Sequence, residues 1–409
     1  MYENLAIFAA FVFLYSAAGG GLERTPISGA IVFAAFGLVV GPLGLNLLTL
    51  DIDAEGMRGL AEMTLALVLF TDAANANLGV LKKKIGLPRR LLLVGLPLTI
   101  LLGYGLGILV FDGLATLEIA LLATMLAPTD AALGKAVVTN ESVPTDIRES
   151  LNVESGLNDG ICVPVLFVFL ALATGSEAEG GTAMLALGLV AEEIGIGLAV
   201  GLCLTYSLGW ILENCADRGW VTETWRQLPV VALSVVCFCV AQLLGGSGFI
   251  ACFAGGMLFG WLAKKRRHRL LLAAEGTGDT LALVTWVIFG AAVVGQSLGS
   301  FSWQVVLYSV LSLTVVRMVP VFLVLAGTGL RADEKLFMGW FGPRGLASIV
   351  FGVIVLQQHL PGGGTISMTV VCTILLSVIG HGLTANPLAR ALGARVAGGS
   401  AAGAPGEKN

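Results

Sequence analysis

Apolar segments of about twenty residues recur along the whole chain and limit how it can fold. A helix needs roughly 20 consecutive apolar residues to cross the hydrocarbon core of a bilayer. Thirteen segments of the sequence meet this requirement. Charged residues make up 12% of the chain and hydrophobic residues 56%, whereas ordinary soluble domains carry about 25% charged residues. The sequence therefore predicts an all-α polytopic membrane protein with about thirteen transmembrane helices.

The expected spans divide the chain into two similar halves. They cover approximately residues 3–20, 26–46, 60–80, 91–111, 115–138, 147–174, 183–212, 228–244, 248–263, 278–297, 303–328, 335–358 and 364–389. If the seventh span is a linker, six spans precede it and six follow it. A single linking span also makes the second half start with the opposite orientation, so we expect two inverted six-helix repeats.

The basic residues predict how the chain sits in the membrane. With the N-terminus outside, 20 of the 23 Lys and Arg residues fall in loops on the cytoplasmic side. Arg58 alone falls on the other side, and Arg317 and Arg344 lie in or beside apolar segments. This asymmetry follows the positive-inside rule. We expect an outside N-terminus and a cytoplasmic C-terminus, with residues 391–409 as a short disordered tail.

Two expected spans are interrupted in the middle by Pro and Gly beside a charged residue. Span 115–138 contains Ala127-Pro128-Thr129-Asp130, and span 335–358 contains Gly342-Pro343-Arg344-Gly345. Pro removes a helix hydrogen bond, and freed backbone groups at membrane depth must be satisfied by protein or line a cavity. Either interruption alone could be a structural kink. Because each is the fifth span of its half, the pair points to a binding site of an inverted-repeat transporter.

The sixth span, 147–174, carries the polar run Glu154-Ser155-Gly156-Leu157-Asn158-Asp159-Gly160. An ionisable residue in a membrane span is by default a functional-site hypothesis. Ser155 and Asp159 are four residues apart and share a helix face, and Glu154 and Asn158 form the adjoining strip. With Thr129 and Asp130 from the first interruption, they offer carboxylate, hydroxyl and carbonyl oxygens, which are hard ligands suited to a cation such as Na⁺.

Asp159 is the expected carrier of the transported ion. Burial favours the protonated form of a carboxyl group, so Asp159 can hold a proton and release it when a cation arrives. Occupancy by either a proton or a cation is a sufficient basis for exchange. The alternative is a buried Asp159 that only bonds neighbouring helices. The sequence lacks a GxxxxGK[ST] loop, so we expect no nucleotide, no cofactor and no nucleic acid, and an ion gradient as the energy source.

The other ionisable residues in the spans have structural or accessory interpretations. Arg317 needs an anion within the membrane, and we expect an ion pair with Glu154, with snorkelling of Arg317 to an interface as the alternative. Arg344 could offset the negative site or cap a half-helix. Asp72, late in span 60–80, is either a pathway or gate acid or an interfacial helix residue. His381 is interpreted as a satisfied helix-end residue, with a proton relay as the alternative.

The motifs resemble those of the monovalent cation/proton antiporters of the NhaP/NHE branch. The resemblance is carried by Ala127-Pro128-Thr129-Asp130 and by Asn152 to Gly160, of which Asn158-Asp159 with the Thr129-Asp130 interruption is the most specific part. It is supported by Leu69-Phe70-Thr71-Asp72-Ala73, Gly248-Phe249-Ile250-Ala251, Gly342-Pro343-Arg344-Gly345 and His381-Gly382-Leu383-Thr384-Ala385-Asn386-Pro387-Leu388. It extends over nearly all of residues 1–390.

The resemblance implies a fold of thirteen helices with crossed broken helices and an elevator-like motion. It implies a homodimer, with core helices at about 91–174 and 303–389, dimerisation or scaffold helices at about 3–80 and 228–297, and a linker helix at about 183–212. The family's cation site would fall on Thr129, Asp130, Ser155 and Asp159, and its structural ion pair on Glu154 and Arg317. Asn158 stands where the electrogenic branch has a second Asp, which implies electroneutral exchange of one cation for one proton.

The sequence therefore predicts an antiporter that exchanges Na⁺ or Li⁺ for H⁺ across a bacterial inner membrane. A K⁺/H⁺ antiporter of the same fold is the nearest alternative, since oxygen ligands alone do not distinguish the two cations. A cation channel is a further alternative. An enzyme is not expected, because the sequence offers no HExxH motif and no Ser/His/Asp grouping.

Overall fold

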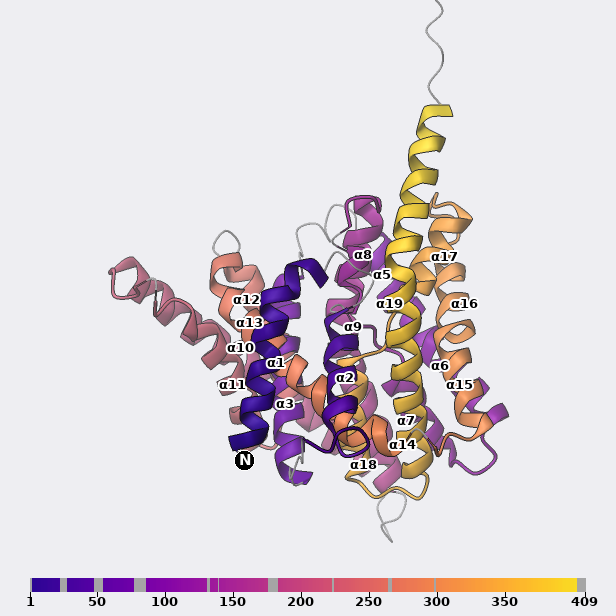
Figure 1. The fold of residues 1–409 in the computed structure, drawn as a ribbon. Helices are drawn as coiled ribbons and strands as arrows, with labels where there is room; N and C mark the ends of the chain where they lie inside the picture. The colour runs from indigo at the N-terminus through magenta and orange to yellow at the C-terminus, as the bar shows by residue number, and fades with distance from the viewer. Residues whose placement is uncertain are drawn as a thin grey trace, which may run out of the picture.

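The computed structural model describes residues 2–22, 28–47, 54–76, 86–130, 133–138, 140–175, 183–222, 224–263, 267–297 and 299–402. Within these ranges the chain forms helices joined by loops, with no strand (Figure 1). Lys82, Lys83 and Lys84, the run 264–266 and the tail 403–409, all used in the orientation argument, lie outside the described residues.

Each of the thirteen expected spans contains helical residues. The first half contains α1 (Tyr2–Leu22), α2 (Gly29–Val40), α3 (Ala54–Asn75), α5 (Gly86–Arg90), η1 (Leu91–Gly95), α6 (Leu96–Val110), α7 (Thr116–Met125), α8 (Lys135–Val138) and α9 (Thr145–Gly175). The helix α10 (Ala183–Asp217) is followed by α11 (Leu228–Leu243), α12 (Gly248–Ala263), α13 (Arg267–Ile288), η2 (Phe289–Val294), α14 (Gly295–Ser297), α15 (Trp303–Leu313), α16 (Val315–Val324), α17 (Ala332–Trp340), α18 (Leu346–Leu356) and α19 (Gly363–Ala402).

The all-α polytopic class is confirmed, whereas the number of crossings stays a prediction. Seven stretches of helix in the described ranges are long and apolar enough to cross a membrane, and five further apolar helices are shorter. The expected spans 115–138 and 335–358 each appear as two helices separated by a non-helical stretch. The interruptions predicted from Pro and Gly are therefore real breaks in the helices.

Glycines allow the helices α3, α10 and α12 to approach one another closely. Gly256 and Gly260 lie one turn apart on α12, and a Cβ at either position would overlap a backbone carbonyl of α3, at Phe70 or Ala74. Gly201 on α10 meets the Ala251 carbonyl of α12 in the same way. Small residues at helix interfaces permit such close backbone contact in membrane proteins, and here they join α3, α10 and α12.

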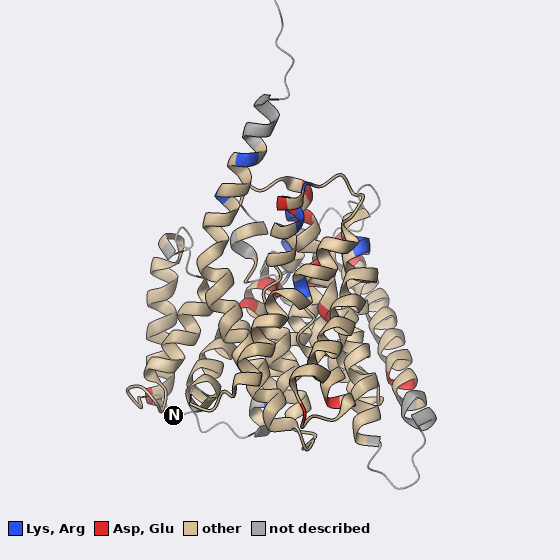
Figure 2. Ribbon diagram, turned by 90° about the vertical axis from the view of Figure 1, so that its right-hand side faces the viewer, with Lys and Arg blue, Asp and Glu red and all other residues tan. Residues whose placement is uncertain are grey.

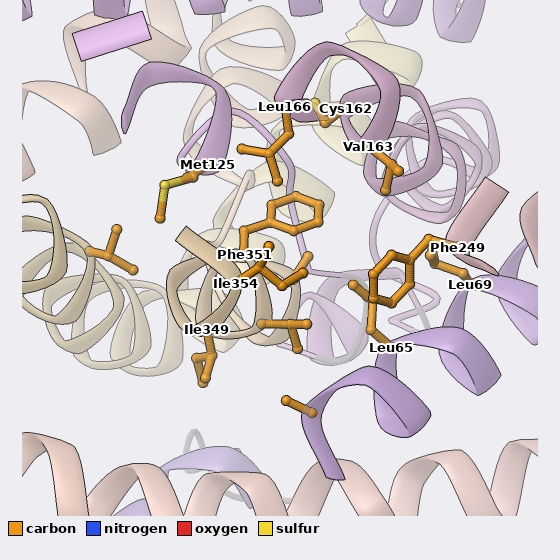
Figure 3. Close-up of a cluster of buried hydrophobic side chains, with 14 of the residues drawn as sticks. Leu65, Leu69, Met125, Cys162, Val163, Leu166, Phe249, Ile349, Phe351 and Ile354 are labelled. Atoms are coloured by element: carbon orange, nitrogen blue, oxygen red, sulfur yellow. The ribbon is translucent and has the colours of Figure 1, made fainter. Parts of the chain in front are cut away.

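An apolar cluster connects this helix group to α9 and α18. Figure 3 shows Leu65 of α3, Phe249 of α12 and Leu166 of α9 around the α18 residues Phe351 and Ile354. Phe351, Leu65 and Leu166 are completely buried. The cluster packs the apolar sides of α3, α9, α12 and α18 against one another.

The C-terminal helix extends further than the sequence analysis expected. Residues 391–402 belong to α19, which projects beyond the other helices (Figure 1), so their assignment to a disordered tail is wrong. Leu392 is buried in a cluster with Phe337 and Ala389, and Val396 packs against that cluster. This apolar stripe at intervals of three and four residues keeps the segment helical.

Candidate ion-binding site

The two helix breaks face each other and are joined by their backbones. The first break lies between α7 and α8, and the second lies between α17 and α18. The backbone N–H of Asp130 in the first break donates to the carbonyl oxygen of Pro343 in the second, at 2.7 Å. The described residues of the two breaks therefore form one polar centre inside the helix bundle.

Asp130 satisfies backbone amides that the breaks leave without helical partners. Its Oδ2 accepts from the N–H of Leu346, the first residue of α18, at 2.8 Å. Its Oδ1 accepts from the N–H of Leu133 at 3.0 Å. A carboxylate at a helix N-terminus is stabilised by the unpaired amides and the helix dipole. Gly345 is required here, because a Cβ at this position would overlap the Asp130 carboxylate.

Arg344 satisfies the opposite kind of group, the carbonyls that follow α7. Its Nη1 donates to the Ala127 oxygen at 2.7 Å and to the Pro128 oxygen at 2.9 Å. A positive charge is favourable at a helix C-terminus. Arg344 is completely buried, so it caps the half-helix from within the protein, one of the two roles that the sequence left open.

Helix α9 presents its polar face to the first break at Thr129. Ser155 Oγ donates to the Thr129 carbonyl oxygen at 2.5 Å, and Asn158 Nδ2 donates to Thr129 Oγ1 at 2.6 Å. Thr129 Oγ1 also lies 3.3 Å from Ser155 Oγ, within hydrogen-bond range. All three side chains are buried. Residues that the sequence placed on two separate spans are thus in direct contact.

Asp159 lies on the same side of α9 as Ser155 and is 7% exposed. Its Oδ1 is buried and has no hydrogen-bond partner in the described part of the chain, and the same holds for Asn158 Oδ1. Those ranges also contain no ion pair of Asp159 within 4.0 Å. A space of about 10 Å³ is lined by Thr129, Asp130 and Ser155 but not by Asp159, and it is about the volume that one water-sized group needs.

Asp72 lies closer to this centre than the sequence indicated. A Cβ at Gly156 of α9 would lie 3.6 Å from the Asp72 Cβ on α3. Gly156 follows Ser155 directly in the chain. Asp72 is therefore an acidic residue of α3 that packs against α9 beside Ser155.

Glu154 and Arg317 form a bidentate ion pair between α9 and α16. Arg317 Nη1 donates to Glu154 Oε1 at 2.5 Å and Nη2 donates to Oε2 at 2.7 Å. Both residues are 1% exposed, so Arg317 does not snorkel to an interface. Two parallel bonds between guanidinium and carboxylate fix the geometry as well as the charge balance.

Some residues around the second break were not singled out as site residues by the sequence. The backbone N–H of Arg344 donates to Ser377 Oγ at 2.7 Å, and His381 Nε2 lies 2.8 Å from the Trp340 carbonyl oxygen. Ser377 has no motif or charge that would identify it. His381 could be found as a lone polar ring in an apolar span, and the structure places it within the bundle at 3% exposure.

Comparison with known proteins gives the family. The profile described as the transmembrane sodium/hydrogen exchanger matches residues 7–391. The chain is 21% identical over 369 residues to the K⁺/H⁺ antiporter NhaP2 of Shewanella sp. strain ANA-3, covering 90% of this chain and 63% of that protein. It is 25% identical over 242 residues to a Na⁺/H⁺ antiporter of Schizosaccharomyces pombe, covering 56% of this chain and 52% of that protein.

A solved structure has the same fold. The sodium proton antiporter MjNhaP1 from Methanocaldococcus jannaschii at pH 8 superposes with a TM-score of 0.77 at 21% identity, covering 93% of this chain and 98% of that one. The chain belongs to the sodium/hydrogen exchanger family, and the resemblance to antiporters of the NhaP type is confirmed. These relatives are named as transporters, in agreement with the expectation that the chain is not an enzyme. The chain spans 63% of the length of the NhaP2 relatives.

Loss of the ion pair should destabilise the fold more than loss of an exposed pair. Glu154→Gln leaves a buried guanidinium without a counter-charge and should lower the free energy of unfolding by about 3–5 kcal/mol. Arg317→Lys keeps the charge but loses the bidentate geometry, so its effect should be smaller. The control Glu62→Gln breaks the Arg58–Glu62 pair, in which the Arg58 side chain is 47% exposed, and should cost less than about 1 kcal/mol.

Thermal unfolding of the purified protein in detergent measures all three variants against the wild type. Unchanged stability in both Glu154→Gln and Arg317→Lys would show that the pair does not hold α9 and α16 together.

Proposed function

We propose that this protein exchanges Na⁺ or Li⁺ for H⁺ across a membrane, with Asp159 as the shared carrier. The observation that supports this most strongly is a buried carboxylate whose Oδ1 lacks a hydrogen-bond partner among the described residues. Ser155 lies on the same face of α9 as Asp159, and its Oγ bonds to Thr129 of the first break. A buried charge is costly unless it is neutralised, so Asp159 has reason to bind a proton or a cation. Asp130, Thr129, Ser155 and Asn158 complete the proposed site.

Five charged side chains around the two breaks support a ratio of one cation to one proton. Asp130, Glu154 and Asp159 bring three negative charges when ionised, and Arg317 and Arg344 bring two positive ones. In the Glu154–Arg317 pair the two charges balance each other. Asp130 is stabilised by the hydrogen bonds that it accepts from backbone amides. One negative charge, on Asp159, is left to be balanced by a single proton or a single monovalent cation. Binding both together would leave an excess positive charge in a low-dielectric interior.

In the proposed transport cycle the core helices move relative to the scaffold helices, so that the ion site opens to each side of the membrane in turn. The proposed core contains α5 to α9 and α15 to α19, and the proposed scaffold contains α1 to α3 and α11 to α13, with α10 as linker. The apolar cluster of Figure 3 lies between α3 and α12 on one side and α9 and α18 on the other. We assign to it the barrier on the outer side of Asp159. Asp72 is the acidic residue of the scaffold beside the site and is assigned to the ion pathway.

The orientation and assembly of the protein are also part of the proposal. Figure 2 shows most described Lys and Arg residues toward the end of the molecule where α19 projects. This distribution supports a cytoplasmic C-terminus and an outside N-terminus by the positive-inside rule. We place the protein in a bacterial inner membrane as a homodimer that associates through its scaffold helices.

K⁺ is the second candidate cation, because the NhaP2 relatives are named as K⁺/H⁺ antiporters. The oxygen ligands around Asp159 suit either ion. Proteoliposomes that contain a pH dye, with additions of Na⁺, K⁺ or Li⁺, show directly which of the three cations is exchanged for protons. The salt that collapses an imposed pH gradient at the lowest concentration identifies the preferred cation.

Asp159→Asn should abolish cation-dependent proton movement in these proteoliposomes. Asn is close in shape to Asp but cannot exchange a proton for a cation. The matched control Asp146→Asn, at the exposed start of the same helix α9, should keep the wild-type rate. Persistent saturable exchange by Asp159→Asn would contradict the carrier assignment, and proton movement without any added cation would favour a channel.

The membrane potential should not shift the equilibrium of the exchange. A cycle that moved one net charge would gain about 2.3 kcal/mol per 100 mV, which would change the final cation gradient about fiftyfold. For a one-to-one cycle we expect the same final gradient at zero potential and at about 100 mV of either sign. The measurement is the end point of cation accumulation in voltage-clamped vesicles, and a strong voltage effect would contradict the one-to-one ratio.

A further inference from the structure

One face of α19 holds both ends of the second helix break. Ser377, His381 and Thr384 are spaced by four and three residues, so they lie on the same side of the helix. At the α18 end of the break, the backbone N–H of Arg344 donates to Ser377 Oγ at 2.7 Å. At the α17 end, His381 Nε2 lies 2.8 Å from the carbonyl oxygen of Trp340, the last residue of α17. The break is thus clamped to a single turn of a neighbouring helix.

The contact with Trp340 makes Nε2 of His381 a hydrogen-bond donor. The Trp340 carbonyl can only accept, so Nε2 carries the hydrogen of that bond. On the other side of the ring, Nδ1 lies 3.2 Å from Ser377 Oγ and 2.9 Å from the Ser377 carbonyl. Ser377 Oγ also accepts from the Arg344 N–H. The His381 ring therefore lies between the Trp340 carbonyl and Ser377, which contact the two ends of the break.

A second contact fixes the end of α17 against the same turn. The indole Nε1 of Trp340 donates to Thr384 Oγ1 at 2.9 Å. The Trp340 and His381 rings lie 4.9 Å apart between centroids, tilted by 31°. The residue before the break is therefore held through its backbone by His381 and through its side chain by Thr384.

The clamped break in turn holds the proposed ion site. Pro343 accepts from the Asp130 backbone, and Leu346 donates to the Asp130 carboxylate. Gly345 leaves no space between the break and that carboxylate. Thr129 precedes Asp130 directly and contacts Ser155 and Asn158. A displacement of the second break would consequently move Thr129 and Asp130, which belong to the proposed ion site.

We propose that His381 is a positioning residue for cation binding, acting through the Trp340 carbonyl and Ser377 on the second break. This role rests on the proposed function and names a determinant of its cation affinity. The His381 side chain does not contact the transported ions and fixes the geometry in which Thr129 and Asp130 face α9.

The test compares two substitutions that differ in which imidazole nitrogen they replace. In His381→Gln the amide nitrogen reaches the position of Nε2 and can donate to the Trp340 carbonyl. In His381→Asn the shorter amide reaches only the position of Nδ1, so the buried carbonyl loses its donor. For the cation that the wild type exchanges, we expect His381→Asn to raise the apparent KM about tenfold and His381→Gln to raise it less than about threefold.

The measurements are KM and maximal rate of exchange in proteoliposomes, together with thermal unfolding of each variant in detergent. A merely structural role would lower the unfolding temperature and leave KM unchanged. A wild-type KM in His381→Asn, or an equal rise in both variants, overturns the positioning role. If His381→Asn does not fold, Ser377→Ala decides in its place: a KM rise of about tenfold supports the role, and an unchanged KM overturns it. A wild type that exchanges none of the three cations overturns the proposed function, and this role with it.

Discussion

Two broken helices form hydrogen bonds to each other's unpaired backbone groups, and the rest of this structure depends on these bonds. The Asp130 carboxylate accepts from the first amide of α18, and the Arg344 guanidinium donates to the carbonyls that follow α7. Without such partners each unsatisfied group at membrane depth would cost several kcal/mol. Each break carries the side chain that the other requires, so neither break is stable alone. Their crossing brings irregular backbone to the middle of an otherwise regular helical protein.

The crossing also determines which charge is left without a permanent partner. Arg317 is held by Glu154 in a buried bidentate pair, and Asp130 is occupied with backbone amides. Asp159, on the same helix as Glu154 and one turn after Ser155, has a buried oxygen that no described group satisfies. The same helix thus carries one acid paired with a basic residue and one whose Oδ1 has no partner among the described residues. This separation of roles is the physical basis of the proposed antiport.

The sequence predicted those features in which an unpaired polar or charged group would cost free energy in the membrane. Pro128 and Pro343 predicted the breaks because proline cannot complete a helix, and Arg317 predicted a buried acid because a cation in lipid needs one. The partners of Arg344 could not be predicted, since they are backbone carbonyls that carry no signature in the side chains. Ser377 was missed for the same reason. The helical residues 391–402 were missed because Leu392 and Val396 belong to an apolar cluster with Phe337, which lies on α17.

The central claim is that Asp159 holds either a proton or a cation and never both. It is tested most directly by adding Na⁺, K⁺ or Li⁺ to the purified, weakly buffered protein and following the pH of the solution while cation binding is measured in parallel. Linkage between the two ligands requires that protons be released as the cation binds. The account predicts the release of one proton for each cation bound. Saturable cation binding without any proton release would contradict it.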